Sequence, residues 1–217
     1  MPRYSVEISL QDQPGALGAV ATLIGAMGGD VIDVDVLEHG RGRARDELTV
    51  ELSGPSQAEE LGRRLGELPG VDVEQLAPVG EYGHHLLVDA LEVASAVVTE
   101  TSVDGVLDAL VSGCVAAFGV SWAVLAREGE DRLLAAAGQV PPAVVASAGG
   151  EGPRFVGSDD CLDLPIGAGP AMGALALVVG REGWPFLNRE RRELTTLTHI
   201  CATRLGQLGQ LGQLDHP

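Results

Sequence analysis

The hydrophobic pattern changes its period across residues 11–15, and this change is the feature that most constrains the fold of the first part of the chain. Apolar and polar residues alternate over positions 4–10, which is typical of a half-buried strand. Over positions 17–27 the apolar residues instead recur at helical spacing. We therefore expect a strand that leads through a short breaker into an amphipathic helix.

The residues that flank this helix predict where it begins and ends. Pro14 suits a first turn, and Asp12 or Gln13 is expected to cap the helix by accepting a hydrogen bond from a free N–H group. Gly28 and Gly29 are expected to end it.

Four further elements are predicted before residue 79. They are, in order, a strand at 32–36, a strand at 47–52, a helix opened by Pro55 and a strand that begins at Val71. Residues 40–45 are predicted to form a polar turn after His39. Its Arg41, Arg43 and Arg45 are expected to be solvated, or to contact an acidic partner or the sister domain. The order strand, helix, strand, strand, helix, strand indicates an α+β, ferredoxin-like βαββαβ unit with an antiparallel sheet and two helices on one face.

Two segments of this unit carry a family resemblance. The first is Asp12-Gln13-Pro14-Gly15-Ala16-Leu17 after the first strand, and the second is the glycine-terminated helix with the Asp30-Val31-Ile32 that follows it. Together with the element order, they make residues 3–77 similar to an ACT domain.

The resemblance implies regulation by a small molecule, usually an amino acid, bound where the first loop meets a second ACT unit. The positions implied to bind the ligand are Asp12, Gln13, Gly15, Ala16, Leu17, Asp30 and Val31.

Elementary physical chemistry allows such a site. The first N–H groups of a helix have no intrahelical acceptor and lie at the positive end of its dipole, so that a ligand carboxylate can bind there. Gly15 would allow a close approach, and Asp12 or Asp30 could accept hydrogen bonds from a ligand ammonium. In the alternative interpretation, Asp12 only caps the helix, Asp30 only closes a turn, and the unit serves dimerisation.

The composition of residues 79–83 indicates a short linker between an ACT-like domain at 1–78 and a second domain at 84–217. The second domain opens with His84 and His85, which we expect to face solvent at the start of a helix. Adjacent histidines on a helix point in different directions, so that they do not make a two-ligand metal site.

The remaining elements are predicted as helix, helix, two strands, a variable insert, two strands and a long helix. Apolar residues at helical spacing that include Leu87, Leu91, Ala94 and Val98 predict the first helix. Residues 101–107 at the start of the second helix, the hairpin at 164–175 and the entry to the last helix at 186–190 resemble a GAF domain, an α/β fold with a central antiparallel sheet.

This second domain departs from the family in its insert. The insert at 139–160 is short and contains one aromatic side chain, Phe155. Because aromatic side chains would be needed to stack on a purine or a tetrapyrrole, we expect neither a bound cyclic nucleotide nor a chromophore. A structural dimerisation domain with a vestigial pocket is the simpler interpretation. Glycine recurs every third residue in the tail from Leu205 to Leu214, which predicts fraying.

Composition excludes several classes of function. The net charge is −17 and both halves are acidic, which argues against nucleic acid and anionic membranes as partners. No lysine occurs, which excludes Schiff-base chemistry and a lysine-dependent phosphate loop. Cys114, Cys161 and Cys201 have no metal-ligand spacing and are expected as free thiols in a cytoplasmic protein, and no apolar run is long enough to cross a membrane.

No catalytic group, metal site or cofactor motif is found in the sequence. We therefore expect a regulatory small-molecule sensor and not an enzyme, acting as a homodimer that binds an amino acid or similar molecule and passes the signal to a protein partner. The alternative is a non-catalytic dimerisation and protein-interaction scaffold without a small ligand.

Overall fold

The structure is a computed structural model that describes residues 1–40, 42–79, 86–127, 133–142, 144, 161–167 and 174–214. The chain divides into two compact units, Met1–Glu81 and Tyr82–Pro217. His84, His85, Arg41, most of the linker and most of the insert at 139–160 lie outside the described residues.

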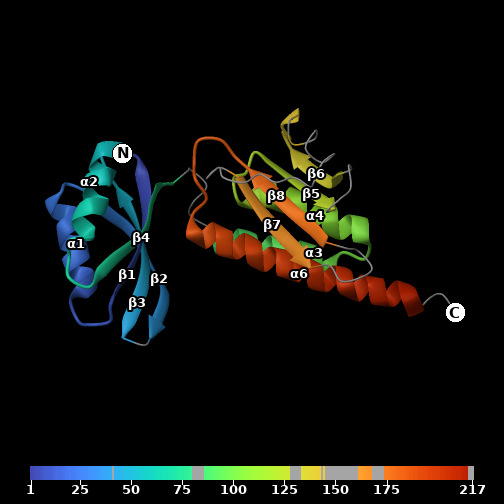
Figure 1. Ribbon diagram of the computed structural model, residues 1–217, viewed down its shortest axis with the longest axis horizontal. Coiled ribbons are helices and arrows are strands. Elements are labelled where there is room, and N and C mark those ends of the chain that lie inside the picture. The colour runs from blue at the N-terminus through green and yellow to red at the C-terminus, as the bar shows by residue number, and fades with distance from the viewer. Residues whose placement is uncertain are drawn as a thin grey trace. The chain divides into compact units, whose positions relative to one another are not determined.

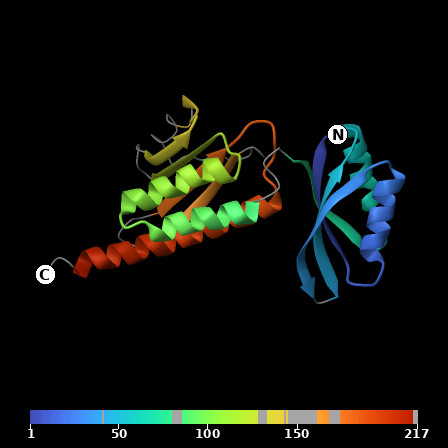
Figure 2. The same ribbon diagram turned by 180° about the vertical axis from the view of Figure 1, so that it is seen from behind.

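The amino-terminal unit has the predicted order of elements. These are β1 (Arg3–Gln11), α1 (Ala16–Ala26), β2 (Asp30–Gly40), β3 (Arg43–Glu51), α2 (Pro55–Leu65) and β4 (Val71–Pro78). The antiparallel sheet has the order β2-β3-β1-β4, and both helices lie on one of its faces (Figures 1 and 2). The predicted ferredoxin-like arrangement is therefore confirmed.

The core of this unit lies between the sheet and the two helices. Alternate residues of β1 are buried there, and each is paired with a residue of β3 that points to the same face: Tyr4 with Val50, Val6 with Leu48, Ile8 with Asp46 and Leu10 with Ala44. Helix α1 contributes Val20 and Ile24, and α2 contributes Ala58, Leu61 and Leu65. The period-two pattern thus fixes which face of each strand meets the helices.

Strand β2 lies at the edge of the sheet and leaves apolar side chains exposed. Ile32, Val34 and Val36 are 40%, 39% and 62% exposed, respectively. Val34 and Val36 are paired with Leu48 and Asp46 and so point to the helix-covered face, but they lie beyond the cover of the helices. An exposed apolar edge strand is a surface that proteins normally pair or protect.

The arginine-rich turn is shorter than predicted. Strand β3 begins at Arg43, so that Arg43 and Arg45 belong to the sheet, and His39 lies in β2 and not in a turn. Arg43 contacts Asp72 of β4 at 2.5 Å, and Arg45 contacts Glu74 at 2.9 Å. These two guanidinium groups pair with acids of their own unit, and Arg43 remains 45% exposed, as expected of a solvated arginine.

The carboxy-terminal unit also has the predicted order. Its elements are α3 (Leu86–Thr99), α4 (Val103–Ala117), β5 (Trp122–Arg127), β6 (Leu133–Gly138), β7 (Cys161–Gly167), β8 (Ala174–Gly180) and α6 (Asn188–Leu214). The sheet is antiparallel with the order β6-β5-β8-β7, and a single large core cluster joins the three helices to it. This is the α+β arrangement with a central antiparallel sheet that was expected of a GAF-like domain.

Helix α3 buries a different face from the one its most obvious pattern suggested. Its buried residues are Ala90, Val93 and Val97, whereas Leu91 and Val98 are exposed. The helix is apolar almost all round, so that spacing alone does not determine which stripe faces inward. The packing against α4 and α6 determines it instead.

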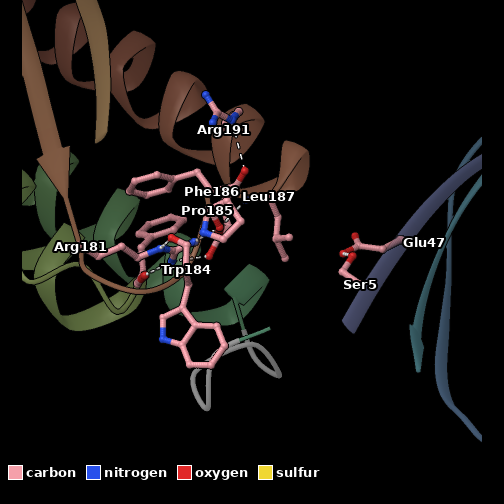
Figure 3. A network of polar contacts seen from close by, with 10 residues as sticks. Ser5, Glu47, Arg181, Trp184, Pro185, Phe186, Leu187 and Arg191 are labelled. Atoms are coloured by element: carbon pink, nitrogen blue, oxygen red, sulfur yellow. Dashed lines mark hydrogen bonds and ion pairs between the residues drawn. The ribbon is translucent and has the colours of Figure 1, made fainter. Parts of the chain in front are cut away.

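Arg181 joins the end of β8 to the beginning of α6. Its guanidinium group donates to both carboxylate oxygens of Glu190, at 2.9 and 2.5 Å, and to the carbonyl groups of Phe118, Trp184 and Pro185 (Figure 3). Both side chains are less than a tenth exposed. Glu190 also accepts a hydrogen bond from the N–H of Leu187 at 2.7 Å. An acid at the third position of a helix commonly accepts such a bond from the backbone N–H of the residue before the helix.

Helix α6 continues through the glycine-rich tail to Leu214, where we had expected fraying. Each further residue adds a hydrogen bond to a helix that packing has already nucleated, and this compensates for the low helical propensity of glycine.

Candidate functional site

Backbone hydrogen bonds hold the loop between β1 and α1 in place. The N–H of Asp12 donates to the carbonyl oxygen of Gly42 in the β2–β3 hairpin at 3.1 Å, and the N–H of Gln13 donates to the carbonyl oxygen of Gln11 at 2.8 Å. The helix then begins after Gly15, which has a φ of 92° and is the N-cap residue. This left-handed conformation is accessible to glycine at little cost and is strained for other residues.

Helix α1 begins without a side-chain cap, which corrects the prediction that Asp12 or Gln13 caps it. Ala16 N–H donates to Gln13 at 3.2 Å, but among the described residues the N–H groups of Leu17 and Gly18 have no acceptor. Gly15 is exposed, and a Cβ placed on it would meet no atom within 4 Å. Two donors at the positive end of a helix therefore lie beside open space, which is the geometry that binds a carboxylate.

The Asp12 carboxylate is engaged with His39. The distance from its Oδ2 to His39 Nε2 is 3.2 Å, and both side chains are more than a third exposed. The interaction joins the loop to β2. It also replaces the capping role expected of Asp12, because the same carboxylate is directed to a histidine and not to the helix.

The other predicted positions fall into two groups. Gln13 is exposed in the loop, and Ala16 and Leu17 are half-buried against the core at the start of α1. Asp30 and Val31 begin β2, where Asp30 is paired with Glu51 and Val31 with Val50. They therefore lie at the end of the sheet opposite to the loop, separated from it by the 11 residues of α1 or roughly 16 Å.

One polar residue that sequence reasoning missed lies near this loop. Asp46 of β3 is 3% exposed, and its Oδ1 atom has no hydrogen-bond partner in the described part of the chain. Burial raises the pKa of this carboxyl group, and the nearby His39 partly offsets the rise. The alternation of Ala44, Asp46, Leu48 and Val50 would have placed Asp46 on the apolar face, but the strand was expected to begin only at Glu47.

The three cysteines are free thiols. Burial raises the pKa of Cys114 and Cys201 to about 12 and that of Cys161 to about 11, so that all three are protonated near neutral pH and are poor nucleophiles. In the part of the chain that the structure describes, no three side chains of His, Cys, Asp or Glu are grouped in a way that could hold a metal ion. No helix there is long and apolar enough to cross a bilayer.

A comparison with known protein families identifies the domain in the first unit. The family model of the ACT domain matches residues 4–70. No curated protein is significantly similar in sequence to the chain.

Two solved structures are similar to the chain. One is the GAF domain from an Acinetobacter phosphoenolpyruvate-protein phosphotransferase, with 15% identity, a TM-score of 0.42, and coverage of 60% of this chain and 99% of that chain. Another is an unknown protein from Galdieria sulphuraria, with 11% identity, a TM-score of 0.32, and coverage of 95% of this chain and 92% of that chain.

The backbone at Gly15 predicts a contrast between two glycines three residues apart. Gly15→Ala should lower the free energy of unfolding by about 1–2 kcal/mol, because alanine is strained in the left-handed conformation. Gly18→Ala should raise it by about 0.5–1 kcal/mol, because Gly18 is helical and a Cβ there has open space. Urea unfolding of both variants tests this, and effects of the same sign would contradict the assigned helix start.

Proposed function

Starting from the ACT domain at residues 4–70, we propose that the chain is a regulatory sensor and not an enzyme, and that it binds an amino acid or a similar small molecule. ACT domains are regulatory ligand-binding domains. The observation that carries the proposal is the pair of free N–H groups of Leu17 and Gly18 beside the open surface at Gly15. We place the ligand carboxylate on these groups and its ammonium near Asp12.

The charges around the loop favour this orientation of the ligand. Helix α1 contains no charged residue, so that nothing in its own sequence offsets the positive end of its dipole. Asp12 supplies a carboxylate in the loop itself, and the surface position of its contact with His39 leaves it accessible. The N–H groups of Leu17 and Gly18 would therefore donate to the carboxylate of a zwitterionic ligand, and Asp12 would accept from its ammonium.

A homodimer would complete the site. Strand β2 lies at the edge of its sheet, and antiparallel pairing of two copies of β2 centred on Asp35 would place Asp30 of the second copy opposite Gly40. Asp30 and Val31 of one copy would then lie beside His39 and the loop of the other. The two separated groups of predicted ligand-binding residues would in this way form one site.

The surface beside this edge supports such pairing. The exposed Val34 and Val36 point to the same face as α1, and only Val20 and Ile24 of that helix are buried. The exposed residues of α1 are small and uncharged and allow another chain to approach closely: Gly18, Ala19, Ala21, Thr22, Gly25 and Ala26. We expect a cytoplasmic protein, consistent with its three free thiols, that passes the signal to a protein partner.

The second candidate is a dimerisation and protein-interaction scaffold without a small ligand. The exposed apolar side chains of Val88, Leu91 and Val98 on α3 favour it, because they form a further surface on which a protein could dock. This candidate predicts the dimer but no response to amino acids.

A thermal-shift panel of the twenty amino acids at millimolar concentration tests the sensor. At 100 times its dissociation constant, a true ligand should stabilise the fold by about 2.7 kcal/mol. Asp12→Asn should weaken binding about tenfold or more, because the charge opposite the ammonium is lost. Asp108→Asn, the same substitution at an exposed position of α4 in the other unit, is the control and should leave the affinity unchanged. A flat response of the wild-type chain to all twenty would reject the sensor and leave the scaffold.

Light scattering at micromolar concentration tests the dimer. The wild-type chain should have the mass of two copies, and Val36→Glu should give a monomer, because a charge would be buried at the paired edge. Val88→Glu, an equally exposed valine on α3, should remain a dimer. Dimers of Val36→Glu together with monomers of Val88→Glu would move the interface to the other unit.

A further inference from the structure

Among the described residues, none forms a hydrogen bond with the Oδ1 atom of Asp46. Its register partners are the apolar Ile8 of β1 and Val36 of β2, and α1, which covers this face, has no charged residue. Among the described residues, His39 is the one basic side chain with an electrostatic interaction with it, and the Nε2 atom of His39 is already occupied by Asp12. A carboxylate in such surroundings is costly unless a cation reaches it.

The position of Asp46 relates it to the loop. Along β3 it lies two residues inward from Ala44, which is paired with Leu10 at the end of β1. That separation is about 6–7 Å of strand, on the face that α1 covers. Its neighbour Val36 is 62% exposed, so that only one side chain on the β2 side separates Asp46 from the molecular surface.

We propose that Asp46 binds a second positive charge of the ligand, and that the site therefore selects amino acids with a cationic side chain. This inference rests on the proposed amino-acid site. The ligand carboxylate lies on the N–H groups of Leu17 and Gly18, and its α-ammonium lies near Asp12 in the loop. The side-chain ammonium extends inward along the sheet to the free Oδ1 of Asp46, which a neutral amino acid leaves unpaired.

The test compares L-lysine and L-ornithine with L-norleucine, which has the same number of carbon atoms as lysine but an uncharged side chain. Isothermal titration of the full chain should give an affinity for one of the two basic amino acids that is about 10- to 100-fold higher than for norleucine. Asp46→Asn should remove this preference and retain the binding of norleucine. Asp108→Asn, at an exposed position of α4, is the control and should retain the preference.

The ligand-free stability of Asp46→Asn provides a second readout. A carboxyl group whose pKa is raised by folding stabilises the protonated fold, and this contribution is lost as the pH rises through the raised pKa. The amide should therefore raise the Tm at neutral pH by about 2–4 °C. A lower Tm would assign Asp46 a structural role and contradict the proposal.

The outcomes distinguish the two proposals. Equal affinity for lysine, ornithine and norleucine, or a preference that survives Asp46→Asn, would overturn the role of Asp46 and leave the amino-acid site intact. The absence of binding by all three and by the remaining amino acids would overturn the site itself and the role of Asp46 with it.

Discussion

The left-handed backbone at Gly15 is the constraint on which the candidate site depends. It lets the chain turn from β1 into α1 at a glycine, which has no side chain that could cap the helix. Among the residues that the structure describes, the N–H groups of Leu17 and Gly18 have no acceptor, and the Asp12 carboxylate contacts His39. A side-chain cap at this position would have stabilised the helix and closed the site at the same time.

The same first unit distributes its functional groups along the whole length of β2. Asp30 begins the strand and His39 lies near its end, so that one copy holds only part of the predicted site at each end. Two antiparallel copies would bring these ends together, and the apolar side chains between them would be covered by the same contact. Ligand binding and assembly would then be linked, because a ligand that contacts both copies stabilises their pairing.

The order of elements followed from the sequence because it depends on period and on chain breakers. The period-two runs, the helical runs and the glycines at 28 and 29 all act locally, and the elements appeared in the predicted order, although β2 and β3 are longer than their patterns indicated. Three details depend on packing or on geometry that no local pattern records. They are the buried face of α3, the contact of Asp12 with His39 and not with the helix, and the pairing of Arg43 and Arg45 within their own sheet.

The sequence could predict candidate site residues as positions but not as an arrangement. The loop residues could be identified from the break between strand and helix, whereas the distance between Asp12 and Asp30 became apparent only from the register of β2. Asp46 was missed because its strand begins four residues earlier than its hydrophobic pattern suggests. The observed start of β3 places the acid on the apolar face, and only the alternation of side chains along the strand reveals its position there.

The amide spectrum of the isotopically labelled full chain tests the central claim most directly. On titration with an amino acid that stabilises the fold, the largest changes in chemical shift should occur at the N–H groups of Leu17 and Gly18, because these donors would gain a carboxylate acceptor. Gly25, near the other end of the same helix, should change little. Shift changes that centre on the carboxy-terminal unit and leave Leu17 and Gly18 unmoved would contradict the account.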